Sequence, residues 1–167
     1  LNDCAGLGWR LDDEKIDVAI LNAGVLGNRT QGLQAPFQPS FDEVMHTNVL
    51  AAMRILPIVL PMVENASGTL AVLSSKMGSI GLRDNNASWL YRASKAALNS
   101  VLKDVSLSAQ KTTCIAFHPG WVQTDMGGAG AEISVDVSVS GMRKVIAESG
   151  PAQNGQFLSY DGTRLDW

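Results

Sequence analysis

Short apolar runs alternate with longer stretches of helical periodicity along this chain. The runs of strand length, rich in aliphatic and β-branched residues, fall at 16–21, 68–73, 113–117 and 156–160. Apolar residues at helical spacing fall at 41–63, 89–110 and 138–149, after a polar helical or loop segment at 1–15. Strands that alternate with helices are typical of α/β folds with a parallel sheet, and this is the class we predict.

The predicted helix over 41–63 carries signals at both ends and one polar residue inside. Ser40 and Glu43 form a capping box that would start the helix. Pro57 and Pro61 are expected to kink it or to shorten its last turns. Asn48 lies among apolar residues, and a buried amide without partners costs about 1–3 kcal/mol. It therefore either bonds to nearby backbone or has a functional role.

The composition is that of a globular protein, with 167 residues, 46% of them hydrophobic and 17% charged. We expect a single domain over 1–167. The net charge of −3 provides no basic stripe for nucleic acid and no polybasic membrane patch. The apolar run 49–63 contains an arginine and two prolines and is expected to be too short to span a bilayer.

The cysteines indicate neither a disulfide framework nor a metal site. Cys4 and Cys114 are the only two, and they lie far apart in the sequence. This usage favours a reducing, cytoplasmic setting.

Each predicted strand ends in small or polar residues. Asn22-Ala23-Gly24 follows the first strand, Ser74-Ser75 the second and His118-Pro119-Gly120 the third. The carboxyl ends of parallel strands meet at one edge of a sheet, where α/β folds bind ligands. We therefore expect these residues to lie near a ligand cleft.

Tyr91 and Lys95 lie four residues apart on the predicted helix over 89–110, which places them on one helical face. A positive charge beside a phenol favours the phenolate, and we expect it to lower the pKa of Tyr91 from ~10 by about 1–3. By itself the spacing is equally compatible with a packed tyrosine and a solvated lysine.

Five motifs in order resemble the short-chain dehydrogenase/reductase family. They are Asn22-Ala23-Gly24, Asn48, Ser75, Tyr91-x-x-x-Lys95 and Pro119-Gly120-x-x-x-Thr124. Ser75 rather than Ser74 matches the family serine, because Gly78 follows it in the pattern Ser-x-x-Gly. The run 118–126 and the tail 156–167 are similar to the C-factor (C-signal) subgroup.

The resemblance implies a Rossmann-type doubly wound parallel sheet and an oxidoreductase that uses NAD or NADP on a small carbonyl or alcohol. It implies that Tyr91 is the catalytic acid/base and that Lys95 lowers its pKa and holds the nicotinamide ribose. It further implies that Ser75 binds the substrate oxygen and that Asn48 anchors a water chain to Lys95. The implied cofactor-binding residues are Tyr91 and Lys95 again, with Asn22, Ala23 and Gly24 on the adenine side and Pro119, Gly120, Val122 and Thr124 around the nicotinamide.

The substrate side of the site is less defined. Trp89, Trp121 and the loop 127–136 are candidates for the substrate wall and are equally plausible as packing residues. A homodimer through the helices 41–63 and 89–110 is expected from the habit of the family and from their apolar faces; the same faces could simply cover the sheet.

The sequence departs from the family at its amino-terminal side. No Gly-x-x-x-Gly-x-Gly follows a strand, and Gly6 and Gly8 lie in the wrong context. At ~30 residues per strand–helix unit, we expect roughly 75 residues of the family pattern to be missing. The strand at 16–21 should then be a sheet edge. Two alternatives to an enzyme stay open, a signalling or binding protein on the same fold and an inactive fragment.

Overall fold

The computed structural model describes residues 6–11 and 14–167. Its strands, all parallel, form one sheet in the order β1-β2-β3-β4. They are β1 (Val18–Leu21), β2 (Thr69–Leu73), β3 (Thr113–His118) and β4 (Gln156–Ser159). The predicted α/β class with a parallel sheet is confirmed, and each strand lies within two residues of its predicted bounds.

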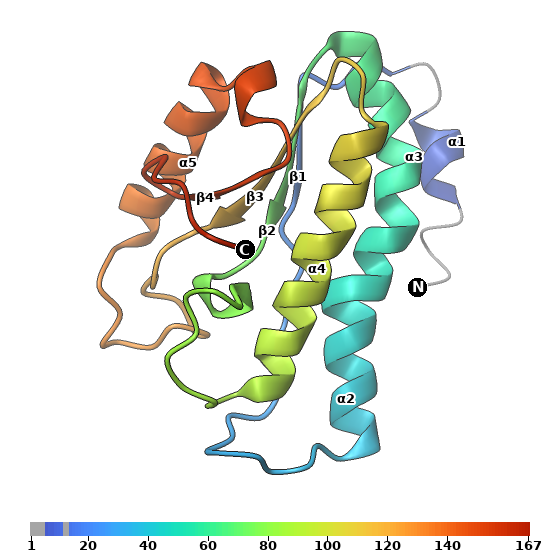
Figure 1. The fold of residues 1–167 in the computed structure, drawn as a ribbon. Coiled ribbons are helices and arrows are strands. Elements are labelled where there is room, and N and C mark those ends of the chain that lie inside the picture. Colours follow the sequence, from blue (N-terminus) through green and yellow to red (C-terminus); the bar gives the residue numbers. More distant parts are fainter. Residues whose placement is uncertain (1–5, 12–13) are drawn as a thin grey trace.

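Helices cover both faces of this sheet (Figure 1). On one face α3 (Ala51–Ala66) and α4 (Trp89–Ser108) lie side by side and enclose a core that includes Leu56, Leu102 and Val72. On the other face α5 (Val135–Glu148) packs on Ile115 and Phe117. Two covered faces are the doubly wound arrangement that the family resemblance implied. Short helical elements complete the described fold: α1 (Leu7–Arg10), α2 (Gln38–Met45) and the 3₁₀ turns η3 (Lys76–Gly78) and η4 (Pro151–Gln153).

The helix that was predicted over 41–63 differs at both ends. It starts at Gln38, with Phe37 as N-cap and no side-chain cap, so the capping box at Ser40 is wrong. It continues through a π-helical turn, η2 (His46–Leu50), into α3, which runs past Pro57 and Pro61 to residue 66. Both prolines are exposed, so the carbonyl groups that they leave unbonded lie on the solvent side, where water can bond to them.

The continuous helix Gln38–Ala66 has 29 residues and, by length and composition alone, is apolar enough to cross a membrane. The apolar run 49–63, which was expected to be too short, is therefore only one part of a longer helix. The core helix of a soluble protein passes the same test, and α3 buries Leu56, Val59 and Val63 against the sheet.

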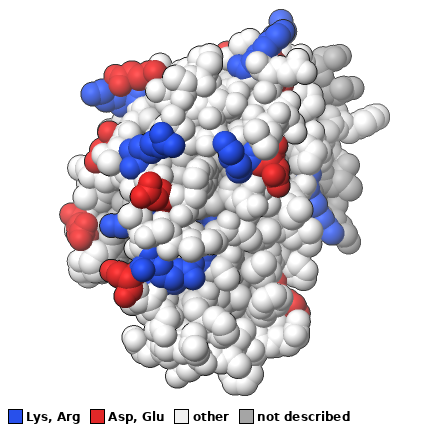
Figure 2. All heavy atoms as spheres, viewed as in Figure 1, with Lys and Arg blue, Asp and Glu red and all other residues white. Residues whose placement is uncertain are grey.

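β1 forms one edge of the sheet in the described part of the chain, as the sequence predicts. Val18 and Ile20 remain 46% and 48% exposed on it. A groove of about 410 Å³ runs between β1 and the helix 38–66, and its lining is mostly apolar. Acidic and basic side chains are interspersed over the face that Figure 2 shows.

The last residues of the chain fold back and hold the loop that follows η3. Leu165 N–H donates to Phe157 O at 2.8 Å, and the Trp167 ring stacks on Phe157 with a centroid separation of 5.5 Å. The amides of Ile80 and Gly81 donate to Trp167 O. This tail therefore fixes one wall of the cavity described below.

Candidate active site

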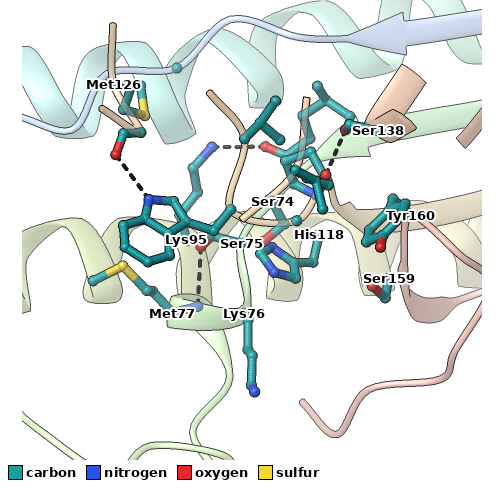
Figure 3. Close-up of a pocket in the computed structure, with 18 of the residues that line it drawn as sticks. Ser74, Ser75, Lys76, Met77, Lys95, His118, Met126, Ser138, Ser159 and Tyr160 are labelled. Atoms are coloured by element: carbon teal, nitrogen blue, oxygen red, sulfur yellow. Dashed lines mark hydrogen bonds between the residues drawn. The ribbon is translucent and has the colours of Figure 1, made fainter. Parts of the chain in front are cut away.

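A cavity of about 850 Å³ opens at the carboxyl ends of the strands, beside the first turns of α4 (Figure 3). It collects most of the predicted site residues: Asn22, Gly24, Ser75, Tyr91, Lys95, Pro119, Gly120, Val122 and Thr124. Two predicted residues lie elsewhere. Ala23 and Asn48 line the groove beside β1 instead.

α4 presents Tyr91 and Lys95 from its first two turns, and both side chains are buried. The Lys95 ammonium donates to Leu73 O at 2.8 Å and lies 5.7 Å from the centre of the Tyr91 ring. Gly78 of η3 packs against this turn, because an added Cβ would lie 2.8 Å from the carbonyl carbon of Lys95. The glycine of the Ser-x-x-Gly pattern thus lets η3 sit directly on α4.

Burial changes the acid–base properties of both groups. It raises the pKa of Tyr91 above its ordinary value, and a hydrogen bond from the Ser75 side chain opposes part of that rise. This direction is opposite to the expected one. The reason is that Tyr91 is itself buried, and loss of hydration penalises the charged phenolate. Burial also lowers the pKa of Lys95, from 10.5 to about 8. In this structure loss of hydration is therefore the largest influence on the pKa of each group.

Ser74 and Ser75 point to different partners at the end of β2. Ser75 Oγ accepts from Met77 N–H at 3.1 Å and lies beside the phenol of Tyr91. Ser74 Oγ donates to Asn99 Oδ1 within the interior. The arrangement gives the serine of the Ser-x-x-Gly pattern the contact with Tyr91.

Asn48 lies in the π-helical turn η2 and is almost fully buried. Its Oδ1 accepts from Val25 N–H at 2.8 Å, and its Nδ2 donates to Val25 O and to Ser94 Oγ, both at 2.9 Å. Ser94 Oγ in turn donates to Tyr91 O. Asn48 therefore joins the loop after β1 to the first turns of α4, and an Oδ1 lone pair remains beyond the bond to Val25.

The loop after β3 closes the other side of the cavity. Gly120 has a φ of 88°, a left-handed conformation that favours glycine, and Ser138 Oγ from α5 donates to Pro119 O at 2.5 Å. Thr124 Oγ1 accepts from Gly127 N–H at 3.2 Å. Arg29 Nη2 donates to Met126 O at 2.7 Å and so ties this loop to the loop after β1.

The sequence analysis missed Ser94, Arg29 and Ser138, and it was only partly informative about the substrate wall. Ser94 had a usable signal, since it stands three residues after Tyr91 on one helical face. Arg29 and Ser138 had no such signal, because each donates a hydrogen bond to the backbone of a loop that is distant in the sequence. Trp121 lines the cavity, whereas Trp89 does not and donates to Gln34 O.

Among the described residues, no group of three or more His, Cys, Asp or Glu side chains could hold a metal ion.

Comparison with known sequences identifies relatives over most of the chain. Residues 10–134 match the family model described as short chain dehydrogenase. C-signal of Myxococcus xanthus is 36% identical over 155 residues, which cover 91% of this chain and 93% of that protein. The short-chain dehydrogenase srdF of Neurospora crassa is 31% identical over 169 residues, which cover 92% of this chain and 66% of that protein.

Solved structures give the same result. Carbonyl reductase Sniffer of D. melanogaster superposes with a TM-score of 0.89 at 29% identity, covering 99% of this chain and 72% of that one. The NADPH-bound carbonyl reductase from chicken fatty liver has a TM-score of 0.85 at 31% identity, covering 99% of this chain and 71% of that one. The chain therefore belongs to the short-chain dehydrogenase family, a family of NAD(P)-dependent oxidoreductases.

Proposed function

We propose that this protein reduces a small carbonyl compound, or oxidises the corresponding alcohol, with Tyr91 as the acid/base. The observation that carries the proposal is the meeting of Tyr91, Ser75 and Lys95 on one cavity, with the phenol and the ammonium buried beside each other. The nicotinamide cofactor, when bound, supplies or accepts the hydride.

In the reductive direction Tyr91 donates its hydroxyl proton to the substrate oxygen as the carbonyl carbon receives hydride. The phenol is protonated at neutral pH, as this step requires, since its ordinary pKa is ~10 and burial raises that pKa. The Ser75 hydroxyl, which lies beside that phenol, hydrogen-bonds the same oxygen and stabilises the charge that develops there. Lys95 keeps the positive charge next to Tyr91, and its pKa of about 8 leaves it mostly protonated at pH 7.

The residues present fit the nicotinamide and ribose half of a dinucleotide. Gly24 leaves the floor of the cavity open, because a Cβ there would lie 3.1 Å from Lys95 Nζ and 3.5 Å from Asn48 Oδ1. We propose that Lys95 and Tyr91 bind the ribose hydroxyls. The adenine-side floor would be formed by Asn22, Ala23 and Gly24, and the nicotinamide would contact Pro119, Gly120, Val122 and Thr124. Several solved relatives carry NADP or NADPH, and the choice between NAD and NADP is part of the test.

Asn48 is proposed as a positioning residue. It holds Val25 and Ser94 in place, and the remaining lone pair of Oδ1 can accept from a water that leads toward Lys95. Such a water would return a proton to the Lys95–Tyr91 pair after each turnover.

The test is a hydride-transfer assay of the full-length protein with NADH and NADPH on simple aldehydes and ketones. Tyr91→Phe removes only the acidic hydroxyl, and we expect turnover to fall by about 10²- to 10⁴-fold. Tyr160→Phe, at the only other tyrosine, removes a hydroxyl from the same cavity and should have a far smaller effect. Equal turnover by Tyr91→Phe and the native protein would disprove the assigned role.

A signalling or binding role is the second candidate, and it rests on the 36% identity to C-signal over 93% of that protein. The two candidates differ in their need for cofactor. A titration of the full-length protein with NADPH and NADH, followed by fluorescence and by the melting temperature, separates them, since a ligand of the native state must stabilise it. Absence of any cofactor binding would favour the binding role.

We also propose a homodimer that pairs through the helices 41–63 and 89–110. Met53 on α3 and Leu107 on α4 are 54% and 74% exposed, so each of these helices has an unburied apolar residue to offer. Sedimentation of the native protein and of a Met53→Glu/Leu107→Glu double variant would test this pairing. A cytoplasmic location is likewise a proposal.

A further inference from the structure

His118 is the last residue of β3 and lines the same cavity as Tyr91 and Ser75. The strand register fixes its neighbours. Leu73 pairs with Phe117, which sets Ser74 beside His118, and His118 itself pairs with Ser159 of β4. Figure 3 shows the imidazole between Ser75 and Ser159, at the end of the cavity nearest β4. No step proposed above uses this side chain.

One ring nitrogen of His118 is enclosed. Nδ1 is buried and has no hydrogen-bond partner among the described residues. A buried N–H without an acceptor is rarer in proteins than an acceptor left with a free lone pair. The enclosed Nδ1 therefore carries the lone pair, and the proton resides on Nε2, the nitrogen left to face the cavity.

The imidazole is neutral across the physiological range. Burial and the positive charge of Lys76 lower its pKa to about 4, although Asp161 opposes the shift. A neutral ring that carries its proton on Nε2 acts as a hydrogen-bond donor without net charge. This end of the cavity thus suits a neutral oxygen acceptor better than a carboxylate or phosphate.

Part of the cavity wall is apolar. Trp121, Ile133, Val135 and Val139 line it, together with Met142. A ligand in contact with both this wall and His118 would meet hydrocarbon and a neutral hydrogen-bond donor. Apolar walls with a few placed polar groups are the usual design of sites that orient a small molecule.

We propose that His118 is a specificity-determining residue, which donates from Nε2 to a second oxygen of the substrate. The preferred substrates would then be carbonyl compounds with a compact apolar body and a further neutral acceptor, such as a second ketone, an ester or an ether oxygen. The inference rests on the proposed function, in that the reacting carbonyl lies at Tyr91 and Ser75.

Binding can be followed without turnover, because the chain has only two histidines. In ¹H–¹⁵N spectra of the imidazoles, His46→Gln assigns the remaining signals to His118, and His46 itself is exposed. We expect cyclohexane-1,2-dione or cyclohexane-1,4-dione to shift the His118 Nε2 resonance and cyclohexanone to shift it far less. If neither dione shifts it more than cyclohexanone does, the proposal is overturned.

Two variants make the kinetic test specific to Nε2. The side-chain amide nitrogen of His118→Gln lies near the place of Nε2, whereas that of His118→Asn lies near the place of Nδ1. With the full-length protein, we expect His118→Asn to raise KM for the better dione about tenfold more than KM for cyclohexanone. His118→Gln should restore most of that preference, and the His46→Gln control should match the native protein.

The outcomes separate the two proposals. If neither the native protein nor any variant transfers hydride but the dione still shifts the His118 Nε2 resonance, the proposed function fails and the binding subsite stands. If Tyr91→Phe abolishes turnover but His118→Asn affects both substrates equally, the proposed function stands and the role of His118 is wrong.

Discussion

The polar groups at the two ends of the sheet differ in how fully they are hydrogen-bonded. At the carboxyl end, Lys95 is buried with a single carbonyl partner in Leu73, and both Asn99 Nδ2 and His118 Nδ1 have no partner among the described residues. At the amino end, the Glu64 carboxylate accepts hydrogen bonds from the amides of Gln110, Lys111 and Thr112.

The difference separates polar groups that stabilise the fold from groups held ready for chemistry. A carboxylate that accepts several amide hydrogen bonds keeps its charge and fixes the turn before β3. A buried ammonium and unpartnered ring or amide nitrogens cost free energy, and such costs are concentrated at functional sites. The carboxyl end of the sheet therefore carries the larger stability cost, although Thr112 Oγ1 at the amino end is also buried without a partner among the described residues.

The largest test of this contrast is the pH dependence of Lys95. Its pKa is lowered in the folded protein from 10.5 to about 8, so between these values the unfolded chain binds more protons and stability rises with pH. Relative to Lys95→Met, the free energy of unfolding of the native protein should rise by about 2–3 kcal/mol between pH 7 and pH 10. Urea unfolding at several pH values measures it.

Lys103→Met is the matched control for that experiment, since Lys103 is an exposed lysine of the same helix. The difference in the free energy of unfolding between Lys103→Met and the native protein should hardly change between pH 7 and pH 10. A Lys95→Met curve parallel to the native curve at every pH would contradict a charged, buried ammonium.

A second test asks whether every polar group at the carboxyl end is costly. Asn48 is not, because its amide bonds to Val25 and Ser94 at 2.8–2.9 Å. Asn48→Leu would leave the Val25 amide and carbonyl without partners, and we expect it to lower the free energy of unfolding by about 1–3 kcal/mol. Ser94→Ala removes one of these partners and should cost less. If the Asn48→Leu variant is as stable as the native protein, the hydrogen bonds of Asn48 do not stabilise the fold.

The sequence predicted the strands and the residues at their ends well, because both depend on local pattern. Buried parallel strands appear as short apolar runs, and the Tyr91–Lys95 spacing fixes a helical face whatever the surroundings. The helix start at Gln38 and the continuation of α3 past Pro57 were missed. Packing of α3 on the sheet tolerates an exposed proline, and the start of α2 has no side-chain cap.

The features that could not be predicted from the sequence depend on burial and on the register of the strands. The direction of the Tyr91 pKa shift follows from loss of hydration around Tyr91, which no spacing encodes. His118 stood next to a recognised motif, yet its place beside Ser74 and Ser159 follows only from the pairing of three strands.

The smallest predicted effect sharpens the contrast from the amino end. Burial acts to raise the pKa of Glu64, but the hydrogen bonds from Thr112, Lys111 and Gln110 outweigh it and the pKa lies below its ordinary value of 4.5. Glu64→Gln keeps an acceptor oxygen but loses the charge, so we expect a loss of only about 1 kcal/mol at pH 7. The pKa of Glu64 is lower in the folded protein than in the unfolded chain, so its charge stabilises the fold at pH values above 4.5. The loss caused by Glu64→Gln should therefore vanish as the pH falls below 4.5 and through the pKa of the folded state. Thermal unfolding from pH 7 to pH 3 measures it, with the exposed Glu43→Gln as control; a pH-independent difference would mean that Glu64 acts by packing and not by charge.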